Sequence, residues 1–331
     1  MKTKLFTLCV SALFICSISF AKIRRVGYFG TAISGTDYST LQAAHDSASV
    51  KDTLMLYPGA YSATYTKNLV TLGYGYFVAG AGANANLQTL NGGMTVGITL
   101  STGSDSSKFE GIDGLTIYEG YLINLKNINI RRCNVTVNGG GAVYTNWQIT
   151  QSFLNSLTIY NSGSRYSNLL VSNCYCANFY LDVISGQSGI LNNNIFYYTF
   201  YLGTGNFLVK NNIFISPNSG NTLAATFLNN ISDGSNLPVG NGNVNSVTTA
   251  NIFVGYPTQG SFSNDGRWVL KVGSPAIAAG EGGIDCGIFG GTTPYRLSGI
   301  PATPSFYKLT APSNTTSTNP YTITFSVRGN N

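Results

Sequence analysis

A short pattern recurs between Phe109 and Ser232, and no recognisable helix separates the copies. Each copy has one or two short apolar strands and a polar pair, and we align the copies on the residue that closes the pair. These residues, which we call the corner column, are Gly114, Cys133, Ser152, Cys174, Asn194, Asn212 and Asn230, at steps of 19, 19, 22, 20, 18 and 18 residues. Such a period is typical of a solenoid, in which each coil buries its inner face only against its neighbours.

The strand that precedes each corner alternates in the way that a half-buried strand requires. We expect the residues three and five positions before the corner to point inwards, and the mostly apolar residue directly after it, such as Ile195 or Ile213, to point inwards too. Asparagine suits the corner because it tolerates a left-handed backbone and its amide can hydrogen-bond the same residue one coil away. The sequence predicts a ladder of Asn194, Asn212 and Asn230, in which Asn230 has one neighbour fewer.

The first 21 residues have the features of a secretory signal. Lys2 and Lys4 precede an apolar run that ends at Ile18, and Ser19 to Ala21 form a small-x-small cleavage pattern. The run is too short for a membrane span. We therefore expect cleavage after Ala21 and a protein that is secreted, periplasmic or at the cell surface, without a membrane span.

The charge of the expected mature chain is mildly positive. The full chain has 18 basic and 12 acidic residues, and loss of two lysines with the signal leaves 16 basic residues and a net charge of +4. Charged residues make up 9% of the chain and form no basic run. Together with export, this argues against a nucleic-acid partner.

Four cysteines remain beyond the signal: Cys133, Cys174, Cys176 and Cys286. Cys133 and Cys174 share the corner column but are separated by one coil, so at ~4.8 Å per coil they lie roughly 9.6 Å apart. This separation exceeds the reach of a disulfide bond. We expect four buried free thiols that pack as small apolar residues.

An N-terminal cap is expected before the repeats. A helix is predicted from Ser39 to Ala48, because Ser39 and Gln42 have the spacing of a capping box and Leu41 and Ala44 share one stripe. It would cover the open strand edge of the solenoid. His45, the one histidine of the chain, lies on this helix. It is interpreted as a solvated cap residue, with a catalytic role as the alternative.

These features place the boundaries between the regions of the chain. We divide the chain into a signal peptide (1–21), an N-terminal cap (22–60), a parallel β-helix with its closing segment (61–291), and a C-terminal linker with a terminal strand (292–331). Prolines at 301, 304 and 312 indicate an irregular linker, and residues 321–327 alternate as a strand does.

Three stretches together resemble the secreted right-handed parallel β-helix proteins of the pectate-lyase-like superfamily. Residues 38–48 and 52–61 resemble their N-terminal cap and first strand, the asparagine-bearing coils resemble their rungs, and residues 273–280 with 285–289 resemble their closing segment. The resemblance covers about residues 37 to 291 and implies an all-β, right-handed parallel β-helix with a capping helix and an irregular C-terminal segment. This fold hosts lyases, hydrolases, esterases, adhesins and tail spikes, so it does not fix the function.

The chain departs from the catalytic motifs of these families. The aspartate motifs and Arg-Trp element of pectin methylesterases have no match, and the paired aspartates and Gly-His-Gly of polygalacturonases are missing. Pectate lyases gather acidic calcium ligands, whereas the twelve acidic residues here are scattered. No catalytic residue of these families carries over.

One charged cluster is a candidate catalytic site. In the alignment Asp113 stacks on Arg132, and Glu110 and Arg131 lie outward on the same two strands. A lyase would use Arg131 to abstract a proton and the carboxylates to hold the sugar acid or a cation such as Ca²⁺. The alternative interpretation is a surface salt bridge that contributes little stability.

Outward tyrosines are candidate carbohydrate-binding residues, since their rings can stack on sugars. They are Tyr118, Tyr121, Tyr160, Tyr197, Tyr198 and Tyr201. The alternative is packing on a strand surface.

We expect an exported protein that binds extracellular or cell-surface polysaccharide, without a cofactor. The alternative is a polysaccharide lyase or glycoside hydrolase that acts along the solenoid, with Ca²⁺ as a cofactor if it is a lyase.

Overall fold

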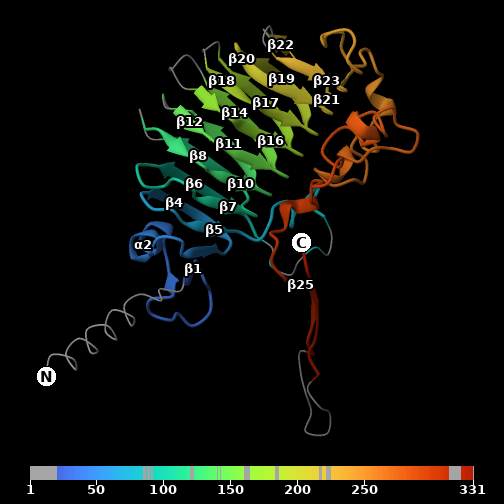
Figure 1. The fold of residues 1–331 in the computed structure, drawn as a ribbon. Coiled ribbons are helices and arrows are strands. Elements are labelled where there is room, and N and C mark those ends of the chain that lie inside the picture. Colours follow the sequence, from blue (N-terminus) through green and yellow to red (C-terminus); the bar gives the residue numbers. More distant parts are fainter. Residues whose placement is uncertain are drawn as a thin grey trace, which may run out of the picture.

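The protein is a parallel β-helix, as the repeats predict. The computed structural model describes residues 21–84, 87, 90, 92–119, 123–139, 141, 143–159, 165–182, 186–215, 218–220, 225–312 and 322–330. Figure 1 shows the coils stacked in sequence order from the blue N-terminal end to the yellow end, with the orange C-terminal region beside them. The stack has about eight turns.

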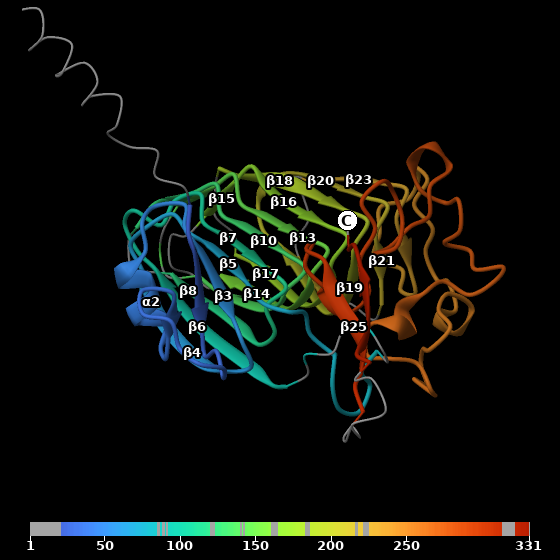
Figure 2. The same ribbon diagram turned by 90° about the horizontal axis from the view of Figure 1, so that it is seen from below.

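Two long parallel sheets face each other across the core (Figure 2). In spatial order the first sheet contains β2 (Asp37–Tyr38), β1 (Ile23–Val26), β3 (Thr53–Leu56), β5 (Val70–Leu72), β7 (Lys108–Glu110), β10 (Asn129–Arg131), β13 (Gln148–Thr150), β16 (Leu169–Ser172), β18 (Gln187–Asn192), β20 (Gly205–Lys210) and β23 (Thr226–Leu228). The second sheet contains β4 (Gly59–Tyr65), β6 (Met94–Leu100), β8 (Leu115–Glu119), β11 (Asn134–Asn138), β14 (Phe153–Ile159), β17 (Tyr175–Leu181), β19 (Ile195–Leu202), β21 (Ile213–Phe214) and β24 (Ile231–Ser232), and β22 (Asn218–Gly220) also pairs with β19.

A shorter third sheet and an irregular region complete the chain. The third sheet contains β9 (Leu125–Lys126), β12 (Val143–Thr145) and β15 (Arg165–Ser167). Residues 246–302, which we call the C-terminal segment, have four short 3₁₀ turns: η1 (Thr249–Asn251), η2 (Gly266–Trp268), η3 (Glu281–Gly283) and η4 (Leu297–Gly299). The chain then forms an antiparallel hairpin of β25 (Ser305–Thr310) and β26 (Thr324–Arg328).

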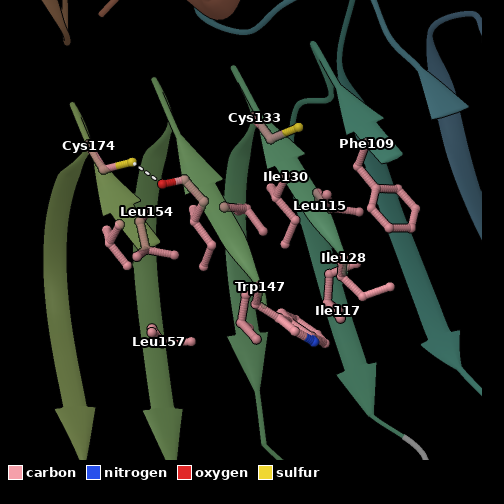
Figure 3. Packing of buried hydrophobic residues seen from close by; sticks show 14 of the residues in the cluster. Phe109, Leu115, Ile117, Ile128, Ile130, Cys133, Trp147, Leu154, Leu157 and Cys174 are labelled. Carbon is pink, nitrogen blue, oxygen red and sulfur yellow. Dashed lines mark hydrogen bonds between the residues drawn. The ribbon is translucent and has the colours of Figure 1, made fainter. Parts of the chain in front are cut away.

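The core lies between the two long sheets, where inward side chains from successive coils stack in rows. Figure 3 shows Phe109 and Ile130 of the first sheet in such a row, together with Leu154 and Leu157 of the second. From Cys133 onwards, the residues three positions before each corner are buried as predicted: Ile130, Ile149, Val171, Leu191, Val209 and Phe227.

Each corner is a pair of residues with separate tasks. The first of the pair has a left-handed backbone, with φ of 52° at Arg132, 51° at Gln151, 55° at Asn173 and Asn193, and 58° at Asn211. The second points into the core and makes the predicted ladder. The amide of Asn194 donates to the Oδ1 of Asn212 (3.0 Å), and that of Asn212 donates to Asn230 (3.0 Å). The same amides also donate to strand carbonyls, so the ladder satisfies buried backbone acceptors.

The ladder continues one step further than predicted. The amide of Asn230 donates to the Oδ1 of Asn243 at 3.0 Å, and that of Asn243 donates to the carbonyl of Phe227. Asn230 therefore does not lack a neighbour, and the expectation that it is the weaker end of the ladder is wrong.

The alignment of the first copy is also wrong. Phe109 pairs with Ile130, and the carbonyl of Ile112 accepts from Asn134 in the way that the later corner residues do. The corner of this coil is therefore Ile112, preceded by Gly111 with φ of 69°. The step to Cys133 is 21 residues, and the sequence pattern hid it because this coil has one extra residue before β8: Leu115, three positions after Ile112, pairs with Val135, two positions after Cys133.

The apolar residues that follow the corners do not point into the core. Tyr175, Ile195 and Ile213 are buried, but they pack against Trp268, Ile288 and other residues of the C-terminal segment. The residue after each of them, such as Phe196, points into the main core instead. Burial beneath a distant segment and burial in the core have the same apolar signature, so the sequence could not distinguish them.

The single described helix, α2 (Leu41–Ser47), caps the first coil. Its N-cap is Thr40, whose Oγ1 accepts from the backbone of Ala43, rather than the expected Ser39. Gln42 accepts the backbone N–H of Thr64 at 2.8 Å, and a ring nitrogen of His45 accepts that of Thr66 at 3.1 Å. These donors belong to or adjoin edge strand β4, so the helix satisfies an edge that would otherwise pair with another chain.

His45 is a structural cap residue, but it is not solvated. Its exposed fraction is 2%, its ring packs near Tyr65, and its Nδ1 contacts a carboxylate oxygen of Asp46 at 2.9 Å. Because the Nε2 of His45 accepts the backbone N–H of Thr66, the proton of the neutral ring is on Nδ1, which donates to the carboxylate of Asp46.

The asparagine ladder yields the first prediction. Replacing Asn212 or Asn230 by Ala removes an acceptor and a donor from a buried chain of hydrogen bonds, so each change should lower the free energy of unfolding by about 1–3 kcal/mol. Chemical denaturation measures this. The exposed Asn138, replaced in the same way, should change stability by less than about 0.5 kcal/mol. Negligible losses at both ladder positions would show that the amides do not stabilise the coils.

The cysteines are free and buried, as predicted. Burial raises the pKa of Cys133, Cys174 and Cys286 from the ordinary 9.0 to about 12. We expect no reaction of the native protein with a thiol reagent at pH 8, and reaction of all four after denaturation. As the pH rises, the thiols of the unfolded chain lose their protons before the buried thiols of the folded chain do. The protonated thiols therefore stabilise the folded protein fully below about pH 9, and this contribution is lost as the pH rises towards 12. Rapid labelling of the native protein would contradict this.

Candidate functional site

Three of the four charged candidates lie together where the first sheet meets its corner. Glu110 on β7 is paired with Arg131 on β10, and the Oε1 of Glu110 lies 4.0 Å from the Nη1 of Arg131 and 3.8 Å from that of Arg132. Glu110 and Arg131 are thus direct neighbours, which the sequence alignment had placed two positions out of register.

Arg132 is almost fully buried, with 1% of its side chain exposed. Its Nη1 donates to the carbonyl oxygens of Ile300 (3.0 Å) and Asn330 (2.8 Å), and its Nε donates to the Oε1 of Gln151 (3.1 Å). Burial and the neighbouring Arg131 lower the pKa of Arg132 to about 10, so its guanidinium stays charged at neutral pH. Arg132 therefore fastens two parts of the C-terminal region to the solenoid.

Glu110 and Arg131 contribute to the same junction. A carboxylate oxygen of Glu110 accepts the backbone N–H of Ala302 at 3.0 Å, and the Nε of Arg131 donates to Gln151 at 2.9 Å. Their side chains are 20% and 38% exposed. The contacts of this cluster are those of a structural clamp, and the catalytic role predicted for Arg131, Glu110, Asp113 and Arg132 stays a prediction.

Asp113 lies apart from the arginines. Its Oδ1 accepts from the side-chain amide of Asn134 at 2.7 Å and from the backbone of Gly114 at 3.0 Å. The predicted stacking of Asp113 on Arg132 is wrong, because it depended on the misplaced first corner. Burial raises the pKa of Asp113, and the partial burial of Tyr74 together with the charge of Asp113 raises the pKa of Tyr74 to about 12.

The left-handed corner residues form a second polar column that the sequence analysis missed. Their side chains hydrogen-bond the backbone of the C-terminal segment. Four of them donate to carbonyl oxygens: Gln151 to that of Pro294, Asn173 to those of Ile288 and Gly290, Asn193 to that of Asp285, and Asn229 to that of Ala279. Asn211 accepts the backbone N–H of Glu281. The C-terminal segment thus runs back from the last coils towards Arg132. The polar pairs of the repeat contained this signal, since two adjacent polar residues need two sets of partners.

The candidate tyrosines separate into two groups on the second sheet. Tyr118 and Tyr201 lie in one outward column, at opposite ends of β8, β11, β14, β17 and β19, which places them roughly 19 Å apart. Tyr118 is 49% exposed, and Tyr201 stacks on Tyr180 with ring centroids 4.5 Å apart.

The second group borders the C-terminal segment. Tyr197 packs against Trp268 and Tyr256, whereas its neighbour Tyr198 is 56% exposed. Tyr197 thus shows the packing that is the alternative to sugar binding, and its side chain is half-buried. Tyr121 and Tyr160 lie outside the described residues.

Within the described ranges, no three histidine, cysteine or acidic side chains gather closely enough to hold a metal ion. No helix in the described part of the chain is long and apolar enough to cross a membrane.

Comparison with known proteins adds no family to this description. No protein-family model matches the chain, and no curated protein matches it.

The clamp gives a prediction that separates Arg132 from Arg131. Asparagine tolerates a left-handed backbone, so Arg132→Asn removes the charge and reach of the side chain without backbone strain. The carbonyls of Ile300 and Asn330 lose a buried donor each, at about 1–3 kcal/mol per group. Hydrogen exchange should therefore become faster in β25, β26 and η4. Arg131→Asn, the matched control, should change this exchange much less, because Arg131 reaches the C-terminal segment only through Gln151. Equal effects of the two changes would contradict the clamp.

Proposed function

We propose that this chain is an exported member of the pectate-lyase-like β-helix proteins that binds extracellular or cell-surface polysaccharide and does not cleave it. Support for export comes from the signal-like features of Met1 to Ala21. Support for binding comes from the outer face of the second sheet, where Tyr118 is half exposed. Thr116 and Thr99 lie beside Tyr118 on this face, and among the described residues the C-terminal region forms no hydrogen bond to either of them.

The proposal that the protein does not cleave the polysaccharide rests on one observation: the charged cluster already binds backbone groups of the C-terminal segment. Arg132 is buried, and Glu110 accepts a backbone N–H of the C-terminal segment. A general base has to reach a substrate proton within hydrogen-bonding distance. In this cluster the positions nearest to Arg132 are filled by the protein's own backbone.

A lyase or hydrolase remains the second candidate. The specific observation in its favour is the pair of Glu110 and Arg131, since 38% of the Arg131 side chain is exposed beside a carboxylate. In a lyase the carboxylate would hold a cation or the sugar acid, with Ca²⁺ as the expected ion.

A screen of residues 22–331 against acidic and neutral polysaccharides tests the proposal. We expect retention of the protein in affinity electrophoresis, with no unsaturated products and no new reducing ends. Tyr118→Ala should weaken the retention several-fold, because a stacked ring contributes about 0.5–1.5 kcal/mol.

Phe29→Ala is the matched control, since Phe29 is 71% exposed but lies at the N-terminal end. It should bind as the unmodified protein does. Product formation that disappears in Arg131→Ala and Glu110→Ala would instead establish the lyase or hydrolase.

A further inference from the structure

The outer face of the second sheet carries two regular columns of uncharged side chains. Strand pairing aligns Ser62, Gly97, Thr116, Thr136, Ser156, Asn178 and Thr199 in one column, and Thr64, Thr99, Tyr118, Asn138, Thr158, Tyr180 and Tyr201 in the other. We call this surface the polar face. Between the columns, Ile98, Ile117, Val137 and Leu157 point into the core.

The polar face contains no charged residue in either column, although the protein as a whole is positively charged. By contrast, the outer face of the first sheet bears Lys108, Glu110, Arg131 and Lys210, and the third sheet bears Lys126 and Arg165. Carboxylate groups of an acidic polysaccharide are recognised best by charged donors. Hydroxyl and amide groups, which both donate and accept, suit the hydroxyls of an uncharged sugar.

The geometry of the polar face suits an extended ligand. Successive coils repeat the same polar positions at ~4.8 Å, so a chain that lies along the solenoid meets a hydroxyl or amide group at every coil. Tyr180 and Tyr201 stack with their planes 13° apart, and Tyr118 stands half exposed near the other end of the face. Such rings supply the apolar surface on which sugar rings pack.

A hollow of about 360 Å³ interrupts the polar face at Gly97. Its lining includes Gln42, Thr64, Thr99 and the ring of Tyr118. A Cβ at Gly97 would meet only Tyr118, at 3.7 Å, so the missing side chain leaves open space rather than avoiding a clash. The hollow therefore places polar groups and one aromatic ring around a space of the size that ligand pockets have.

We infer that the polar face binds an uncharged, extended polysaccharide along the solenoid, with one sugar residue in the hollow beside Tyr118. The inference rests on the proposed function and adds the surface and the class of glycan. Rows of threonine and serine on a flat sheet also suit ordered water. The protruding Tyr118, Tyr180 and Tyr201 and the amides of Asn138 and Asn178 interrupt that regularity and favour the glycan.

Two substitutions test the surface. Thr136→Asp places a charge in the centre of the polar face, and Gly97→Leu fills the hollow from a position where an added Cβ meets only Tyr118, at 3.7 Å. The matched control is Thr150→Asp, because Thr150 is as half-buried as Thr136 but lies on β13 of the first sheet. Thermal unfolding of each variant confirms that the fold is retained.

The probes are hydroxyethyl cellulose, a soluble mannan and polygalacturonate, each in affinity electrophoresis at low and high salt. We expect a neutral polysaccharide to bind with little dependence on salt. Thr136→Asp and Gly97→Leu should each weaken it about tenfold or more, since a desolvated charge or a filled subsite removes the paired groups, whereas Thr150→Asp should bind normally.

The outcomes separate the inference from the proposed function. Binding that both variants retain overturns the polar face as the site and leaves the proposed function intact. Salt-sensitive binding of polygalacturonate alone overturns the neutral class. Absence of binding to all probes counts against both, and thermal hysteresis in a freezing assay without glycan binding assigns the face to ice instead.

Discussion

Hydrogen bonds from corner side chains to backbone and amide groups organise this protein. Each corner needs one residue with a left-handed backbone, and asparagine fills that position in Asn173, Asn193 and Asn211 at little conformational cost. The following residue points into the core, where the amides of Asn194 and Asn212 join one coil to the next. A solenoid has few contacts between distant coils, so such nearest-neighbour bonds carry much of its stability.

The same corners also determine which surfaces stay open. The left-handed residues hold the C-terminal segment against the solenoid, and this segment covers apolar side chains such as Tyr175 and Ile195 at the start of the second sheet. It also supplies the backbone groups that contact Glu110 and Arg132. The polar columns lie further along the same strands, past the side chains that this segment covers. Coil stability and surface exposure thus depend on two adjacent columns of corner side chains, the core ladder and the left-handed residues.

The sequence predicted the coils well and their surroundings poorly. From Cys133 onwards, period-two alternation identified the inward residues, because every coil repeats the same local chemistry. It failed at Gly111, where a glycine in the corner and one extra residue before Leu115 break the pattern, and so it misplaced Asp113 beside Arg132. It failed again at Ile195, because the C-terminal segment that buries this residue is about 90 positions away in the chain.

Arg132 illustrates what the sequence could not show about the charged cluster. An arginine in a column of amide side chains is unusual, and a charge at such a position suggests chemistry. The structure gives a different reason for the residue. At this coil two separate segments of the chain, at Ile300 and at Asn330, meet the solenoid. A guanidinium can donate to the carbonyl oxygens of both residues while it also donates to Gln151. The shorter amide of asparagine supports one segment, so the charge at Arg132 follows from the number of backbone acceptors that meet there.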